Sequence, residues 1–289
     1  MSPPTTLHPS GDLVAPLNFY HPPSDNSPPY NLADLPPTSP LPPRNYSSLP
    51  HPVHLIDIRS NPSLYNLDTH SFLPLLSQPP SHPLLDFSSP SSIETHYYPE
   101  IISLLHRTLP GAHKIIIFDH TLRTSSSPTA PRIPVQRVHI DQTPLSAIKR
   151  VHRHVSSPEE ASQLLSGRYR IINVWRPLNK TPVETYPLAF ASSDSVRDED
   201  IIPVEHRYTQ TGYIGQTAAV KYHPDQKWYY LSGMTTDERL LLQCFDSEAL
   251  KDGSKVKGGR LPHTAFEDPR SREGAEGRES IEVRCLFFG

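Results

Sequence analysis

Cysteine is scarce in this chain of 289 residues, where only Cys244 and Cys285 occur, each within an apolar run. We therefore expect neither a disulfide framework nor a cysteine-based zinc site. An excess of basic charge is also missing, because the formal net charge is −3, which argues against a nucleic-acid partner. No run approaches the roughly 18 apolar residues of a membrane span, and the first 20 residues lack the basic and apolar segments of a secretory signal. These absences predict a cytoplasmic protein with no membrane partner.

Proline, by contrast, is abundant, with 35 residues, more than twice the usual share of roughly 5%. Residues 1–50 are rich in Pro, Ser, Asn and Tyr, a composition typical of a disordered or polyproline II segment. Leu17, Phe19, Tyr20 and Tyr30 are regularly interspersed there, which fits equally an extended arm lying across the rest of the fold. The composition leaves both interpretations open.

Short apolar runs separated by turn signals dominate the remainder of the chain. They predict helices near 70–77 and at 97–111, 144–155 and 156–167, and strands at 51–59, 112–123, 135–144, 168–178, 186–192, 217–224, 227–234, 239–247 and 281–288. The last two strands before residue 239 flank a turn at "HPDQ", which predicts a hairpin. Many short strands with few helices indicate a mainly β fold, a sandwich or barrel with helices packed outside.

The stretch "RVHIDQTP" (137–144) places His139 and Asp141 two positions apart on a predicted strand. Residues i and i+2 of a strand point to the same face, so the imidazole and the carboxylate lie side by side. Such a pair is two thirds of the 2-His-1-carboxylate set that holds non-haem iron. The pair alone is a weak signal, since the chain has 16 histidines and a polar strand end would look the same.

A third ligand and a cation follow far along the chain, in "RLPHTAFEDP" (260–269) and "GRESIEVRCLFF" (277–288). His263 can complete the metal set, and Arg278 with Ser280 can bind the far carboxylate of a 2-oxoglutarate co-substrate through a fork and a hydroxyl. The alternative is an ion-paired edge strand supplied by Glu279, Glu282 and Arg284. The order of the four pieces is more specific than any one of them.

Several residues are candidates for the walls of a pocket. His120 ends the strand 112–123 and either lines the pocket or makes a structural hydrogen bond. Asn173 and Trp175 share one face of a strand, where the amide can hydrogen-bond a metal-bound carboxylate and the indole can wall a substrate pocket; a core tryptophan is the alternative. Trp228 is a further candidate, and together these strands, rich in Trp, Tyr, Ile and Leu, predict a largely apolar substrate.

The motifs "RVHIDQTP", "YRIINVWRPL", "KWYYLSGMTTDE", "LLQCFDS", "PHTAF" and "RESIEVR" resemble those of the fungal hydroxylase/desaturase family of Fe(II)/2-oxoglutarate-dependent oxygenases. The family includes gibberellin desaturase-like, cephem methoxylase-like and meroterpenoid endoperoxidase-like proteins. "PLNFY", "DIR" and "IFDHTLR" are similar to its N-terminal half, so the resemblance extends from about residue 14 to 288.

The resemblance implies a mainly β fold with flanking helices and a double-stranded β-helix (jelly-roll, cupin-like) core. It implies Fe(II), 2-oxoglutarate and O2 as cofactor and co-substrates, and hydroxylation, desaturation or endoperoxidation of a small-molecule natural product. His139, Asp141 and His263 would be the ligands, and Arg278 with Ser280 would hold 2-oxoglutarate, although Arg284 on the same strand is an alternative anchor. The implied domains are a flexible N-terminus at 1–14 and one oxygenase domain at 15–289, with the arm 15–50 packed on its core.

Two other functions are compatible with the same residues. A zinc-dependent hydrolase could use the triad, but the chain has no H-E-x-x-H type motif to supply a general base. A catalytically inactive barrel protein of a biosynthetic cluster, with a binding or isomerase role, is the other. The substrate, the choice among the three oxidations and the oligomeric state, including a homodimer, stay open at this level.

Overall fold

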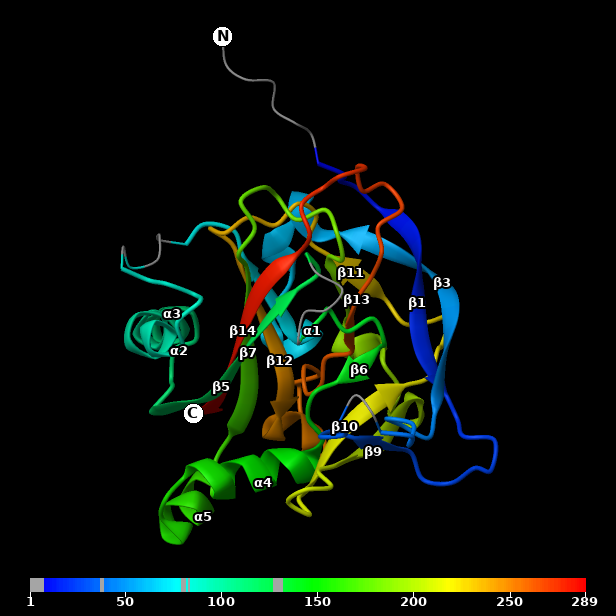
Figure 1. Cartoon of the computed structure of the whole chain (residues 1–289). Coiled ribbons are helices and arrows are strands. Elements are labelled where there is room, and N and C mark those ends of the chain that lie inside the picture. The colour runs from blue at the N-terminus through cyan, green and yellow to red at the C-terminus, as the bar shows by residue number, and fades with distance from the viewer. Residues whose placement is uncertain (1–7, 37–38, 79–81, 83, 127–131) are drawn as a thin grey trace.

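Two curled β-sheets form the body of the protein (Figure 1). The computed structural model describes residues 8–36, 39–78, 82, 84–126 and 132–289. Within these residues the larger sheet has nine strands, in the spatial order β1 (Leu13–His21), β3 (Ser47–Asp57), β11 (Trp228–Tyr230), β8 (Leu188–Ala191), β13 (His263–Ala265), β6 (His139–Ile140), β10 (Ile214–Val220), β9 (Ile201–Arg207) and β2 (Tyr30–Leu32). The smaller sheet has five, in the order β4 (Phe72–Leu75), β12 (Arg239–Asp246), β7 (Tyr169–Pro177), β14 (Glu279–Phe288) and β5 (Lys114–Thr124).

The space between the sheets is filled by side chains from both. Phe190 of β8 and Tyr229 of β11 belong to the same buried cluster as Leu240 and Leu242 of β12. Strands β7 and β12 are buried along their whole length, so both faces of these strands are covered. This two-sheet arrangement is the double-stranded β-helix expected from the sequence.

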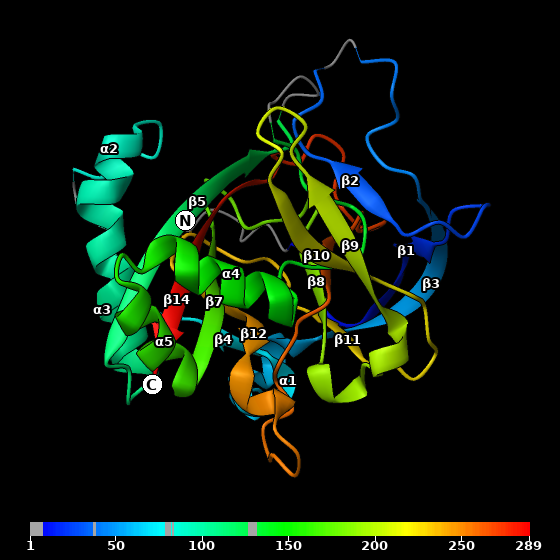
Figure 2. The ribbon, with the colours of Figure 1, turned by 90° about the horizontal axis from the view of Figure 1, so that it is seen from below.

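Helices cover the outer face and one end of the barrel. One helical turn, α2 (Pro90–Ser92), continues through a π-turn into α3 (Tyr98–Thr108), which packs on the outer face of the five-stranded sheet. The view from below shows α4 (Pro144–His154) lying across the end of the barrel, beside α5 (Pro158–Ser166) (Figure 2). Ser157 caps α5 as predicted, with its hydroxyl accepting from the Glu160 amide. Helix α4 directly follows the strand of the His-x-Asp pair, so it frames that site.

The proline-rich arm is ordered where the structure describes it. Strand β1 pairs antiparallel with β3 along its full length, with Leu17 opposite His51. Its alternate residues Leu13, Ala15, Leu17 and Phe19 are buried against the outer face of the large sheet. The predicted boundary at residue 14 falls inside this strand, and residues 1–7 lie outside the described residues.

Three predicted elements are wrong. The segment 70–77 holds strand β4, preceded by the single turn α1 (Leu67–His70), because Phe72–Leu75 pair with β12. The hairpin at "HPDQ" does not form, since β10 pairs with β6 and β9 whereas β11 pairs with β3 and β8. The strand predicted over 135–144 is reduced to His139–Ile140. Strands β1, β2, β9 and β13 were not predicted.

No helix in the described part of the chain combines the length and the apolar character needed to cross a membrane.

The burial of β1 predicts that the arm contributes to stability. We expect Leu17→Ala to lower the free energy of unfolding by about 2–5 kcal/mol, because the side chain is removed from a packed core. Val14→Ala on the same strand, where the side chain is 59% exposed, should change it by no more than about 0.5 kcal/mol. Urea unfolding of both variants measures the difference, and equal midpoints for the two would show that the arm is not part of the core.

Candidate metal centre and its surroundings

The pairing of two short strands brings the three predicted ligands together. Strand β13 lies between β8 and β6, and His263 is directly opposite His139 in the ladder. Nε2 of His139 lies 3.4 Å from Oδ1 of Asp141, and Nε2 of His263 lies 3.9 Å from the same oxygen. All three ligand atoms lie within 4.8 Å of one another. Two imidazoles and a carboxylate converging in this way form the donor set of a mononuclear iron site.

Backbone hydrogen bonds orient both histidines for metal binding. Nδ1 of His139 donates to the carbonyl of Arg137 at 2.8 Å, and Nδ1 of His263 donates to the carbonyl of Leu261 at 3.0 Å. A carbonyl can only accept, so the proton is on Nδ1 and the Nε2 lone pair faces Asp141. Burial, and after it the neighbouring His263, lower the pKa of His139 to about 4, which keeps this ring neutral.

The second oxygen of Asp141 is held away from the histidines. Oδ2 accepts a hydrogen bond of 2.9 Å from Nδ2 of Asn173 and lies 3.5 Å from Nε of Arg284. Burial raises the pKa of Asp141, but opposing effects, among them the charge of Arg284, hold the pKa well below its usual range. The carboxylate is therefore ionised, with Oδ1 directed at the imidazoles. Asn173 makes the carboxylate contact expected of it from the sequence.

Arg284 forms ion pairs with three carboxylates. Its guanidinium contacts Asp119 at 2.9 Å and Glu282 at 3.0 Å in addition to Asp141. Burial lowers its pKa, but these carboxylates have the larger effect, so the pKa of Arg284 is raised overall. Arg284 therefore helps to hold Asp141 in place, and the protein's own carboxylates already offset its positive charge.

Arg278 is buried and forms no ion pair with a described residue. Its side chain is only 2% exposed, Nη1 donates to the carbonyl of Tyr186 at 2.7 Å, and Nε has no hydrogen-bond partner among the described residues. Its guanidinium carbon lies 5.7 Å from the ring centre of Trp175. Burial, with the nearby Arg123 second, lowers the pKa of Arg278 to about 9. The charge of Glu282, which lines the same hollow, opposes this lowering, but no carboxylate of the described chain forms an ion pair with Arg278.

A narrow hollow connects this arginine to the ligands. Its lining contains the whole triad together with Arg278, Trp175, Glu282, Arg284 and Arg123. Ser280, predicted to assist Arg278, is buried but lines a different hollow, beside His120, Leu122 and Arg123. Arg278 and Trp175 therefore line the same hollow as the triad, whereas Ser280 does not.

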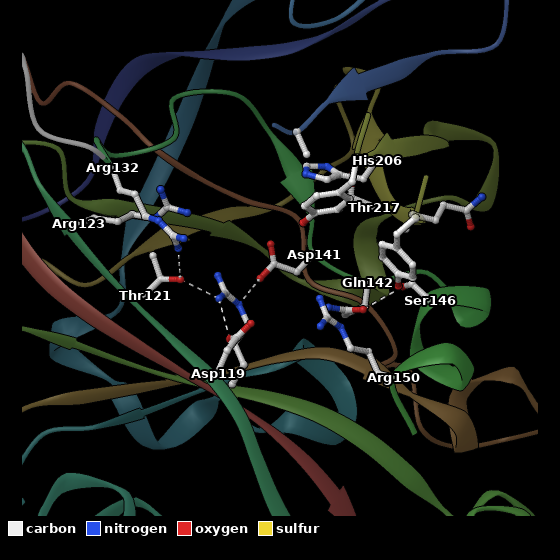
Figure 3. Close-up of a pocket in the computed structure, with 16 residues that line it drawn as sticks. Asp119, Thr121, Arg123, Arg132, Asp141, Gln142, Ser146, Arg150, His206 and Thr217 are labelled. Carbon is white, nitrogen blue, oxygen red and sulfur yellow. Dashed lines mark hydrogen bonds and ion pairs between the residues drawn. The ribbon is translucent and has the colours of Figure 1, made fainter. Parts of the chain in front are cut away.

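A larger hollow of about 500 Å³ opens over Asp141 and Arg284 (Figure 3). Polar side chains dominate its lining: Asp119, Thr121, Arg123, Arg132, Gln142, Ser146, Arg150, His206 and Gln216. The Trp-, Tyr-, Ile- and Leu-rich lining from which a largely apolar substrate was predicted is not found in this hollow. The aromatic and aliphatic residues of the predicted strands pack in the cores instead, and alternate polar residues of β5 face the hollow.

Two of the predicted pocket residues lie elsewhere. Trp228 is buried in the core, edge-on to Phe19 at 5.6 Å, and its Nε1 donates to Gln226. His120 points to the outer side of β5, where Nδ1 is 2.8 Å from the hydroxyl of Tyr98 on α3. That contact is the structural alternative considered from the sequence. Neither residue lines the hollows at the triad.

The acidic and basic residues of β5 were not identified from the sequence, and the central acid of β14, Glu282, was considered there only as an ion-pairing residue. Asp119, Thr121 and Arg123 alternate along β5 and line the large hollow, and Glu282 lies between Ser280 and Arg284 on β14. Alternating polar residues inside an otherwise apolar strand were the available signal for both. No signal marked Tyr186, whose φ of 48° is rare for a non-glycine residue and whose carbonyl holds Arg278.

Comparison with known proteins identifies the family to which the chain is similar. The family described as "Oxidoreductase/YMDC permease-like domain" matches residues 17–288. The hydroxylase/desaturase poxK of Penicillium oxalicum is 39% identical over 97% of this chain and 92% of its own length. The Fe(II)/2-oxoglutarate-dependent dioxygenase nvfI of Aspergillus novofumigatus is 31% identical over 85% of this chain and 86% of its own.

Solved structures extend the likeness to the fold. A structure of the iron and alpha-ketoglutarate-dependent endoperoxidase NvfI superposes with a TM-score of 0.85 and 28% identity, covering 98% of this chain and 99% of that one. The chain therefore belongs to the hydroxylase/desaturase family and is an Fe(II)/2-oxoglutarate-dependent oxygenase.

Proposed function

We propose that His139, Asp141 and His263 hold the iron and that Arg278 anchors 2-oxoglutarate, so that a C–H bond of a small secondary metabolite is oxidised in the hollow above Asp141. The bound iron, with 2-oxoglutarate and O2, supplies the oxidising chemistry, and the overall reaction gives succinate, CO2 and a hydroxylated, desaturated or peroxidised product. The observation that carries the proposal is the unpaired, buried Arg278 in the hollow lined by the triad. The proposed oxygenase domain comprises residues 15–289.

The assignment of Arg278 rather than Arg284 rests on their partners. A guanidinium fork binds a carboxylate bidentately, and the pairing is strong where water is excluded. Arg284 already contacts three carboxylates, whereas the described residues give Arg278 only the neutral carbonyl of Tyr186. A dianionic co-substrate would neutralise the buried charge of Arg278 and fill the bond that its Nε lacks.

The narrow hollow must widen to admit the co-substrate. Its volume of about 20 Å³ suffices for roughly one water molecule. A five-carbon dicarboxylate is larger, so side chains of the lining must move apart on binding. Arg278 is suited to this because a single hydrogen bond to a carbonyl restrains its guanidinium. Trp175, which borders the same space, would wall the co-substrate from the core.

Asn173, Glu282 and Arg284 have a positioning role in this proposal. Nδ2 of Asn173 donates both to Asp141 and to Oε1 of Glu282, and Arg284 contacts the same two acids. The network fixes the rotation of the Asp141 carboxylate, so that one oxygen is presented to the metal. Because Glu282 is engaged in this way, it is not free to act as the general base that a zinc hydrolase would need.

Iron and 2-oxoglutarate binding can be tested directly in anaerobic protein. We expect the weak visible charge-transfer band of the Fe(II)–2-oxoglutarate chelate to form in the native protein and to be absent from His139→Ala and His263→Ala. His152→Ala, which changes an exposed histidine of α4, is the matched control and should retain the band. A native protein without the band would contradict the proposal and favour an inactive barrel protein or a zinc enzyme.

The same titration should distinguish the roles of Arg278 and Arg284. Arg278→Gln is expected to raise the 2-oxoglutarate concentration for half-maximal band intensity by about 10–100-fold, the value of a charged hydrogen-bonded pair. Iron affinity should change little. Arg284→Gln should instead weaken iron binding, because it releases Asp141. The opposite pattern, with 2-oxoglutarate affinity lost only in Arg284→Gln, would transfer the anchor role to Arg284; circular dichroism verifies that both variants fold.

The positioning role of Asn173 has its own readout. Asn173→Ala frees one oxygen of Asp141, and loss of such a supporting contact typically weakens metal binding by about 10–100-fold. Competition of Fe(II) with a chromophoric chelator measures this affinity, and Asn61→Ala, at an exposed asparagine, provides the control. Unchanged iron affinity in Asn173→Ala would show that the Asn173–Asp141 hydrogen bond does not orient the ligand.

A further inference from the structure

The charges that line the large hollow do not balance. Its two carboxylates, Asp119 and Asp141, are both paired with Arg284. Arg123, Arg132 and Arg150 also line it, and none of them forms an ion pair with a described residue. Three cations are therefore left over on the wall of a cavity that lies directly above a ligand of the proposed iron site.

Each of these arginines is held by a neutral group. Nη1 of Arg123 donates to the carbonyl of Ile133 at 3.1 Å, and Nη1 of Arg132 donates to the hydroxyl of Thr121 at 3.0 Å. The guanidinium of Arg150 lies 4.9 Å from the ring centre of Phe118. Such contacts fix the direction of a guanidinium without neutralising it. Figure 3 shows Arg123 and Arg132 side by side on one wall, and Arg150 on the other side of Asp141.

The positive charge continues to the outside along α4. A neighbouring surface hollow shares Asp119, Arg150, Tyr208 and Tyr213 with the large one and adds Lys149, His152 and Arg153. Lys149 donates to the carbonyl of Ile214, and the guanidinium of Arg153 lies 5.4 Å from the ring of Tyr213, again without an acidic partner among the described residues. Clustered charge of one sign at the mouth of a cleft attracts ligands of the opposite sign.

We propose that the metabolite oxidised by this enzyme is an acid, and that its carboxylate binds to Arg123 and Arg132 while its carbon skeleton extends over Asp141. This inference rests on the proposed function, since it takes the large hollow as the substrate site. The basic side chains of α4 steer the acid toward the hollow, and Arg150 faces it across the cavity.

Burial adds a physical reason for an anion at this position. Burial lowers the pKa of Arg123, and the charges of Arg284 and Arg132 lower it further, against the opposing effect of Glu282 and Asp141. Two adjacent guanidinium groups repel each other, and a carboxylate between them converts the repulsion into two charge-assisted hydrogen bonds.

Arg132 distinguishes the proposed acid site from the 2-oxoglutarate site. Arg123 borders both the narrow hollow and the large one, so 2-oxoglutarate also has access to it. Arg132 lines the large hollow and is absent from the lining of the narrow one. Its side chain is exposed, so replacing it should leave folding intact.

A matched pair of probes tests the proposal on protein saturated with Fe(II) and 2-oxoglutarate under anaerobic conditions. Titration with 2-naphthoate and with 2-naphthamide, followed by calorimetry, should show about tenfold tighter binding of the acid. In Arg132→Gln the acid and the amide should bind within about twofold of each other, and Arg132→Lys should restore part of the preference. Arg107→Gln, an exposed arginine of α3, should leave it unchanged.

The visible chelate band distinguishes the possible failures. If the band persists while the acid binds no better than the amide, or binds not at all at millimolar concentration, the acid proposal is wrong and the proposed function stands. Persistence of the acid preference in Arg132→Gln would likewise overturn the assignment of the clamp. Absence of the band before any probe is added would instead contradict the proposed function itself. Loss of the band on adding naphthoate would show displacement of 2-oxoglutarate and would also contradict a separate acid site.

Discussion

The antiparallel pairing of β6 with β13 is the constraint on which the site depends. It places His139 opposite His263, although the two residues lie far apart in the chain. The strands are short, and β8 and β10 flank them in the sheet, so their register is set by the whole sheet and not by a local turn. A shift of either strand by one residue would turn its imidazole to the opposite face of the sheet from the other, because side chains alternate along a strand.

The distribution of charge around the triad would let one small region bind the three proposed ligands. Arg284 neutralises the acids that support Asp141, so its charge stays within the protein. Arg278 is buried beside Trp175 and forms no ion pair, and Arg123 and Arg132, on the side of the large hollow, form none with a described residue either. A metal, a dicarboxylate and an acidic metabolite would thus each meet complementary groups in separate places. The fold achieves this by alternating polar residues on β5 and β14, whose other faces pack on α3.

Features that depend on neighbouring residues could be predicted from the sequence, whereas features that depend on strand pairing could not. Strand alternation predicts that His139 and Asp141 share a face, and the chain order supplies His263 and Arg278. The proposed preference for Arg278 over Arg284 could not be reached from the sequence, because it rests on ion pairs of Arg284 such as that with Asp119 of β5, which only the pairing with β14 brings close. Trp228 was misplaced for a related reason: β11 pairs with β3 and β8, which buries the indole against the N-terminal strand. The amphipathic helices α4 and α5 were predicted nearly to the residue, since their caps and periodicity are local signals.

The most direct test of the central claim is a crystal structure of the protein loaded with Fe(II) and 2-oxoglutarate without oxygen. We expect a metal bound by His139, Asp141 and His263, with the far carboxylate of 2-oxoglutarate on the guanidinium of Arg278, moved from the Tyr186 carbonyl. We also expect Arg284 to keep its contacts with Asp141 and Glu282. A metal bound by other residues, or a co-substrate carboxylate on Arg284 with Arg278 still on Tyr186, would contradict the central claim.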